Sequence, residues 1–111
     1  MNERDEELLL DIIDAIRTVQ AVASGGRASI EERVNSYALI GSFAVIGEAI
    51  NRLSPEIKAA HPEIAWEDVV RFRHFMVHHY MDIDHDRVWQ IIRDDLPVLS
   101  AQITELLGGQ S

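Results

Sequence analysis

The 111-residue chain has no cysteine, few basic residues and no long apolar run. Without cysteine, disulfides and thiolate metal sites are excluded, and a small secreted scaffold is not expected. The N-terminal segment is acidic, whereas a signal peptide starts with basic residues. The longest nearly apolar stretch, residues 37–47, is too short for a membrane-spanning helix, which needs about 20 residues. We therefore expect one cytoplasmic domain, residues 1–111, without membrane contact.

Positive charge is also scarce. Ten Lys and Arg side chains face nineteen Asp and Glu side chains, so the formal net charge is −9. Broad electrostatic attachment to a polyanion requires a basic surface, so we expect no DNA partner. Six of the acids lie in the first fourteen residues, whereas residues 66–80 have two acids, two arginines and three histidines. Any contact with RNA must therefore be local, or use a basic site assembled from more than one chain.

Apolar residues recur at helical spacing along the whole chain and predict an all-α fold. We expect an up-down bundle of about five helices, with the last helix kinked near Pro97, because proline lacks the backbone N–H that a helix interior needs. The first predicted helix ends near Gly25-Gly26, and a capping box Ser29–Glu32 opens the second. A short third helix begins at Ser54-Pro55 and ends at His61-Pro62. The fourth helix covers residues 66–79, and the fifth extends from Asp84 to Gly108.

The predicted second helix is apolar on almost every side. One face has Leu39, Phe43, Ile46, Ile50 and Leu53, and the opposite face has Tyr37, Ile40, Gly41, Ala44, Val45 and Ala49. A helix that is apolar all round must be covered all round, and a second subunit would do this, so we expect a homodimer or a higher oligomer. Glu48, the one charge in this stretch, either faces a gap open to solvent or forms a buried ion pair. We favour a pair with Arg73 or a neighbouring histidine.

The most distinctive segment is a cluster of histidines around residue 76. Arg73, His74, His78 and His79 fall within seven positions, and Tyr80 follows at once. Histidine exchanges protons near neutral pH, and arginine grips phosphate. On an ideal helix, positions 73 and 78 are about 7.5 Å apart along the axis and about 140° apart around it. Either the helix end is distorted, or two copies of the cluster face each other across a two-fold axis.

The order of features around this cluster resembles the HepT branch of the HEPN ribonuclease superfamily. The resemblance covers about half of the chain closely, and nearly all of it in helix order. Asparagine commonly follows the motif arginine in that branch, and His74 takes this position here. The features that carry the resemblance are Ile46-Gly47-Glu48-Ala49, Arg52-Leu53-Ser54-Pro55, Ile64-Ala65-Trp66, the Arg73/His78/Tyr80 motif, Asp84, Val88-Trp89 and Leu96-Pro97.

The resemblance implies a dimeric, metal-independent endoribonuclease that needs no cofactor. Such a protein is the toxin of a type VII toxin–antitoxin pair, and an MntA-type nucleotidyltransferase antitoxin would silence it by transferring AMP to Tyr80. His78 would either remove the proton of the ribose 2′-hydroxyl or protonate the leaving 5′-oxygen. Arg73 would hold the scissile phosphate, with His74 assisting, and the product would be a 2′,3′-cyclic phosphate.

Two other functions fit the same residues. His74 and His78 are four residues apart, as in two-histidine metal sites, and Asp82 would add a third ligand. Alternatively, the chain is a non-catalytic helical module that binds a nucleotidyltransferase but cleaves nothing, which would agree with its acidity. We expect His79 to be a partly exposed neighbour of the site. Residues expected to have structural or loop roles are His61, His85, Trp66 and Trp89.

Overall fold

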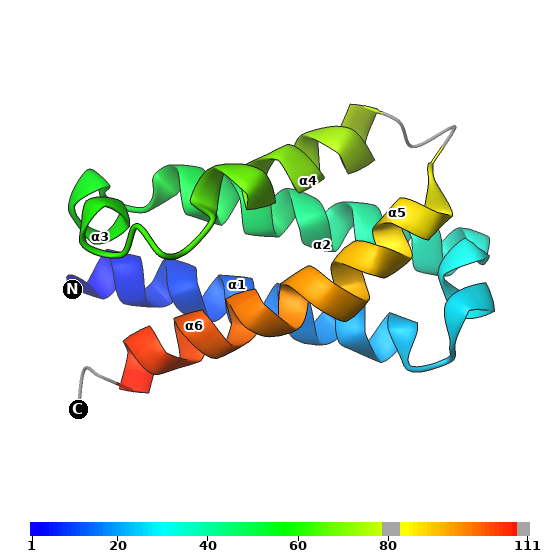
Figure 1. The fold of residues 1–111 in the computed structure, drawn as a ribbon, viewed down its shortest axis with the longest axis horizontal. Helices are drawn as coiled ribbons and strands as arrows, with labels where there is room; N and C mark the ends of the chain where they lie inside the picture. Colours follow the sequence, from blue (N-terminus) through cyan, green and yellow to red (C-terminus); the bar gives the residue numbers. More distant parts are fainter. Residues whose placement is uncertain (79–82, 109–111) are drawn as a thin grey trace.

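The structure, a computed structural model, describes residues 1–78 and 83–108, and the side chains of residues 73–78 also lie outside the description. Within the described residues there is no strand, so the all-α prediction is confirmed. The elements, labelled in Figure 1 where space allows, are α1 (Glu3–Ala23), the 3₁₀ helix η1 (Arg27–Glu31), α2 (Arg33–Arg52), α3 (Pro55–Ala60), α4 (Trp66–His78), α5 (His85–Gln90), the π-helix η2 (Ile91–Asp95) and α6 (Leu96–Gly108).

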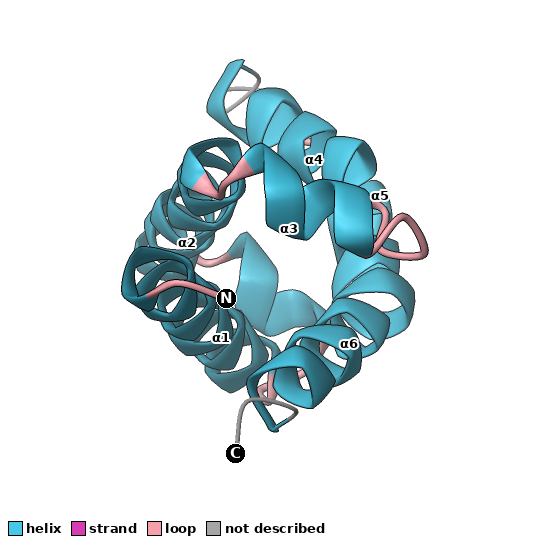
Figure 2. Ribbon diagram, turned by 90° about the vertical axis from the view of Figure 1, so that its left-hand side faces the viewer, coloured by secondary structure: helices cyan, strands magenta, loops and turns pink. Residues whose placement is uncertain are grey.

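The long helices form an up-down bundle. Figure 1 shows α1 and α2 running side by side in opposite directions, with α4 packed on α2 and the last helix packed on α1. The last helix is α5, η2 and α6 in continuous succession. Figure 2 looks along the bundle and shows α3 lying across one end. With α5, η2 and α6 counted as one, the described residues form five helices besides η1, as the sequence predicted.

The core consists of the apolar stripes that periodicity predicted. Fully buried members include Leu9, Ile12, Ile16 and Val19 on α1, Leu39, Phe43, Ile46 and Ile50 on α2, and Val88, Leu96 and Ile103 on the last helix. Burial of each such side chain stabilises the fold by about 1.5–3 kcal/mol. Ala49 was assigned to the outer face of the second helix, but it is 4% exposed and belongs to this core.

The connection between α1 and α2 differs from the prediction. Gly26 has φ 96° and ψ 179°, a conformation that essentially only glycine adopts. Residues 27–31 then form η1, which buries Ile30. The predicted capping box at Ser29 is wrong, because the Ser29 hydroxyl donates to the carbonyl of Val22 at 2.9 Å and α2 begins only at Arg33. The segment folds back onto α1 instead of opening the second helix.

The last helix begins where the sequence predicted, and it contains a π-helical segment just before Pro97. The Asp84 side chain accepts a hydrogen bond from the backbone N–H of Arg87 at 3.1 Å and caps α5. The π segment η2 ends next to Pro97, and the Leu96 N–H reaches the carbonyl of Ile91, five residues back. Pro97 has no N–H to donate to a carbonyl of the preceding turn, and the wider π-helical turn accommodates this missing hydrogen bond.

A buried carboxylate joins α1 to the α2–α3 junction. Asp5 is 3% exposed. It accepts hydrogen bonds from the Ser54 backbone N–H at 2.9 Å and from the Ser54 hydroxyl at 2.6 Å. Ser54 also caps α3, as predicted, by accepting a bond from the N–H of Ile57 at 3.4 Å. This contact holds the start of α1 against the start of α3, at the end of the bundle where α4 begins.

Candidate functional site

Helix α4 is anchored by its first turns. The Trp66 side chain is 7% exposed, and its indole N–H donates to the carbonyl of His61 at 3.2 Å. Val69 is 5% exposed. Glu67 and Asp68 lie in the first turn, where carboxylates interact favourably with the positive end of the helix dipole. The beginning of α4 is therefore fixed on the core.

The predicted catalytic positions lie in the second half of α4. Arg73, His74 and His78 are all within Trp66–His78, so the prediction that one helix carries them is confirmed. His78 is the last residue of this helix. Because α4 is helical throughout this range, positions 73 and 78 lie on different sides of it, whereas 74 and 78 are one turn apart. His79, Tyr80 and Asp82 lie outside the described residues, so their predicted roles remain predictions.

The outer face of α2 is exposed in the single chain. Tyr37 is 57% exposed and Val45 is 46% exposed, and a Cβ added to Gly41 would meet no atom within 4 Å. Glu48 continues this stripe and is also exposed, so the other helices of the same chain do not bury its carboxylate. Its predicted partners have side chains outside the description, so the pairing itself remains a prediction.

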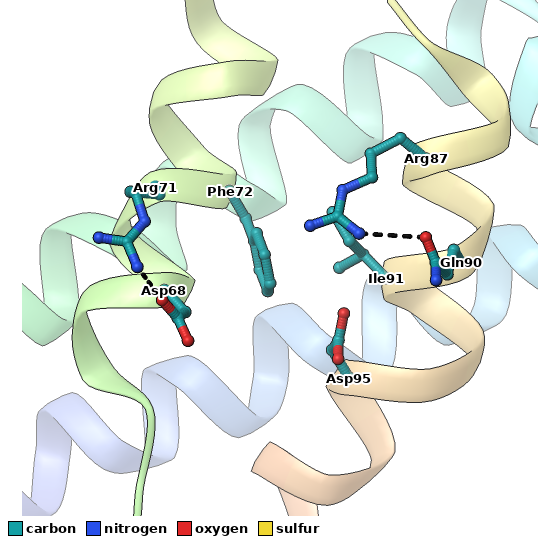
Figure 3. Close-up of a pocket in the computed structure, with 7 residues that line it drawn as sticks. All are labelled: Asp68, Arg71, Phe72, Arg87, Gln90, Ile91 and Asp95. Carbon is teal, nitrogen blue, oxygen red and sulfur yellow. Dashed lines mark hydrogen bonds and ion pairs between the residues drawn. The ribbon is translucent and has the colours of Figure 1, made fainter.

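A groove of about 490 Å³ separates α4 from the last helix. Figure 3 shows Asp68, Arg71 and Phe72 on the α4 side and Arg87, Gln90, Ile91 and Asp95 on the α5–η2 side. A smaller hollow of about 150 Å³ continues it toward α6 and shares Asp68, Phe72 and Asp95 with it. The two hollows form one trough along α4, called the α4 groove below.

Among the described residues, two arginines of the α4 groove contact side chains of their own helices. Arg71 pairs with Asp68 one turn earlier, and both side chains are more than half exposed. Arg87 donates to the side chain of Gln90 at 3.0 Å. Helical spacing in the sequence places Arg71 on the side of α4 that carries His74 and His78. Helical spacing does not point to Arg87, because Arg87 reaches the groove from another helix.

Two ion pairs involve residues of the last helix. Arg27 of η1 donates to Asp86 at 2.7 Å and also contacts Glu31 at 3.4 Å, which ties η1 to the start of α5. Arg93 donates to Asp94 at 3.0 Å, and this hydrogen bond lowers the pKa of the Asp94 carboxyl. Arg93 and Asp94 are both exposed, so their pair adds little to stability, whereas the Arg27 side chain is half-buried.

The remaining aromatic and histidine predictions concern packing and loops. Trp66 is a buried packing residue, and Trp89 packs against the core, as expected. His61 ends α3 and contacts Glu63 at 3.1 Å, and His85 is the first residue of α5.

No group of three His, Asp or Glu side chains in the described part of the chain is arranged to hold a metal ion. The alternative His74/His78/Asp82 metal site lies outside that part. Among the described helices, none is both long and apolar enough to cross a membrane.

Comparison with known proteins identifies the family. The model of the ribonuclease HepT-like family matches residues 9–106. A Thermococcus cleftensis protein named "Probable ribonuclease HepT" is 26% identical over 108 residues, covering 96% of this chain and 98% of its own length. A Methanocaldococcus jannaschii protein named "Putative RNase MJ1380" is 26% identical over 106 residues, covering 93% of this chain and 97% of its own length. No solved structure matches the chain significantly. The resemblance to the HepT branch of the HEPN superfamily is thus confirmed, and the chain belongs to the ribonuclease HepT-like family.

Proposed function

We propose that this protein is a metal-independent endoribonuclease and the toxin of a type VII toxin–antitoxin pair. The observation that carries the proposal is the placement of Arg73, His74 and His78 on the second half of one helix, in a chain that belongs to the ribonuclease HepT-like family. Two relatives along nearly the whole chain are named as ribonucleases. The substrate is RNA and the site of action is the cytoplasm.

The chemistry needs a proton carrier and a fixed cation. As a neutral base, His78 takes the proton of the ribose 2′-hydroxyl, and the 2′-oxygen attacks the adjacent phosphorus. The bond from phosphorus to the 5′-oxygen breaks, and that oxygen takes a proton from a second, protonated imidazole. The products are a 2′,3′-cyclic phosphate and a free 5′-hydroxyl. Arg73 holds the phosphate and stabilises its added negative charge, and His74 helps to orient it.

A second copy of the chain completes the site in this proposal. Position 73 is about 140° around the helix from position 78, so one α4 does not direct both toward one small target. The exposed apolar stripe of α2, with Tyr37 and Val45, offers a surface for the second copy. Joining the two chains there would place two motifs in one cleft and cover Glu48, which lies on the same stripe.

Regulation would act on Tyr80. The antitoxin, an MntA-type nucleotidyltransferase, would transfer AMP from ATP to the Tyr80 hydroxyl and release pyrophosphate. Tyr80 follows His78 by two residues in the sequence, so the phosphate of an attached AMP would be close to the proposed catalytic positions. That phosphate would compete with RNA for Arg73, and inhibition would need no distant conformational change.

The proposal is tested by cleavage of a labelled RNA with purified protein. Arg73→Ala and His78→Ala should each lower cleavage by at least about 10²-fold, because one removes phosphate positioning and the other removes the proton carrier. His61→Ala is the matched control, since it removes a histidine outside α4 and should leave cleavage unchanged. Circular dichroism should show the same helix content in all variants. Wild-type rates of cyclic-phosphate formation in either motif variant would contradict the assigned roles.

The same assay separates the two other functions. The net charge of −9 favours a non-catalytic module that binds a nucleotidyltransferase, and that module would show no cleavage that depends on His78. A metal-dependent enzyme would lose cleavage in a chelator and regain it on addition of a divalent ion. Cleavage that survives the chelator and is lost in His78→Ala would leave the metal-independent ribonuclease as the only candidate of the three.

A further inference from the structure

The α4 groove has the chemical composition of a nucleotide-binding site. Figure 3 shows Arg71 and Arg87 on opposite walls, with the ring of Phe72 between them. Ile91 adds a buried apolar surface, and Gln90 and Asp95 add polar groups. A volume of about 490 Å³ lies within the range of small-molecule sites, roughly 300–1,000 Å³.

Each of these groups matches a part of an unpaired ribonucleotide. Guanidinium groups bind phosphate oxygens with paired N–H donors. Unstacked RNA bases stack on aromatic rings and hydrogen-bond through their polar edges. Carboxylates accept hydrogen bonds from base amino groups. We infer that the α4 groove binds a single-stranded nucleotide of the RNA next to the cleaved bond, with Arg71 and Arg87 on its phosphates and Phe72 under its base.

The location of the groove supports this inference, which rests on the proposed ribonuclease function. Positions 71, 74 and 78 follow each other at i, i+3 and i+7, so they share one side of α4. Positions 71 and 78 are about 10.5 Å apart along an ideal helix axis. An RNA strand that passes the histidines along α4 therefore reaches Arg71 within a short distance, and it must then turn about 100° around α4 to reach Phe72 and the groove that Arg87 faces.

The contacts of these two arginines within the described part of the chain are weak enough to be exchanged for contacts with phosphate. Arg71 is paired with Asp68 in an exposed contact, and exposed pairs are worth only about 0–1 kcal/mol. Arg87 contacts a neutral amide. Asp95 opposes a phosphate placed beside it but suits a base amino group, which makes the groove selective instead of uniformly attractive to polyanions. A protein partner is the other class of occupant, and the experiment below distinguishes it.

Binding of uncleavable RNA tests the inference. Fluorescence anisotropy is measured with labelled 2′-O-methyl octanucleotides of each base, at several salt concentrations. Arg71→Ala and Arg87→Ala should each weaken binding about tenfold and reduce the slope of log K against log salt by about 0.7 for each phosphate that the variant no longer neutralises. Phe72→Leu should also weaken binding about tenfold but leave the slope unchanged, because stacking carries no charge.

Arg93→Ala is the matched control. Arg93 lies on the same last helix, is exposed and is ion-paired, but does not line the groove. If Arg93→Ala weakens binding as much as Arg87→Ala, the arginines act only through diffuse charge and the groove is not a site. Groove variants that bind RNA like the wild type would also overturn the inference. A lower oligomeric mass of the groove variants would overturn it as well, because it would show that the groove is a protein interface.

The inference and the proposed function fail differently. Cleavage by the wild type that is lost in His78→Ala, together with unchanged binding in Arg71→Ala, Arg87→Ala and Phe72→Leu, would refute the groove and leave the ribonuclease in place. Absence of cleavage by the wild type would refute the ribonuclease. Absence of any binding of the octanucleotides by the wild type would refute the groove.

Discussion

Asp5 provides the sharpest test of how the bundle is held together. It is the buried carboxylate that accepts two hydrogen bonds from Ser54, at 2.9 Å from the N–H and 2.6 Å from the hydroxyl. A hydrogen bond to a charged group contributes about 1.5–3 kcal/mol, so the lower bound for two such bonds is about 3 kcal/mol. Asp5→Ala should therefore lower the free energy of unfolding by about 3 kcal/mol, and Tm by about 12 °C at about 4 °C per kcal/mol.

The matched control is Glu6→Ala. Glu6 lies in the same first turn of α1 and is exposed, so its removal causes the same loss of negative charge and of favourable interaction with the helix dipole. Its cost should stay within about 0.5 kcal/mol. The difference between the two variants isolates the contact with Ser54. Urea unfolding followed by circular dichroism measures both, at one fixed protomer concentration because an oligomer is stabilised by concentration.

A double-mutant cycle completes the test. Ser54→Ala removes the hydroxyl that donates to Asp5 and caps α3, and the double variant with Asp5→Ala removes both partners. The coupling energy between the two positions should be at least about 1 kcal/mol. A coupling near zero, or an Asp5→Ala protein as stable as Glu6→Ala, would show that water replaces these bonds at no cost and that the junction does not depend on them.

Four further predictions address the function and the turns. Tyr80→Phe should keep RNA cleavage but take up no AMP from ATP and the antitoxin, whereas mass spectrometry should show one AMP adduct on the wild type. Val45→Glu should leave helix content unchanged but convert the oligomer to monomer in light scattering, since this exposed apolar side chain would be covered by the second copy. Glu48→Gln should reduce both Tm and cleavage of RNA, and unchanged values of both would contradict the pairing with Arg73 or a motif histidine. Gly26→Ala should cost about 1–3 kcal/mol in urea unfolding because of its φ of 96°, whereas Gly108→Ala, in open space, should cost nothing.

The helices of this fold follow from local patterns in the sequence. The stripe on α1, the Ser54-Pro55 start of α3 and the Asp84 cap each depend on residues a few positions apart. Periodicity and capping are interactions of that range, so they can be read directly. The π segment before Pro97 is likewise a local consequence of one residue type.

Contacts between distant residues were not predictable in the same way. Asp5 belongs to a run of acids that looks uniformly exposed, yet it meets Ser54, 49 residues later. Arg87 meets the α4 groove only because two separate helices face each other across it. The wrong capping box has a similar cause, since Ser29 fits the local pattern but bonds back to Val22 on α1. In each case the deciding partner lies on another element.

Part of the acidity of the chain lies far from the end of α4. Glu3, Glu6 and Glu7 are exposed on the first turns of α1. Figure 1 shows the N-terminus beside α3, at one end of a bundle 39 Å long, whereas α4 ends toward the other. Exposed charges are screened over about 8 Å at physiological ionic strength, so acids at the first end scarcely act on a phosphate at the second. These N-terminal acids therefore contribute to the net charge of −9 without opposing RNA at the end of α4, and in the proposed function the arginines on and beside α4 would hold the strand.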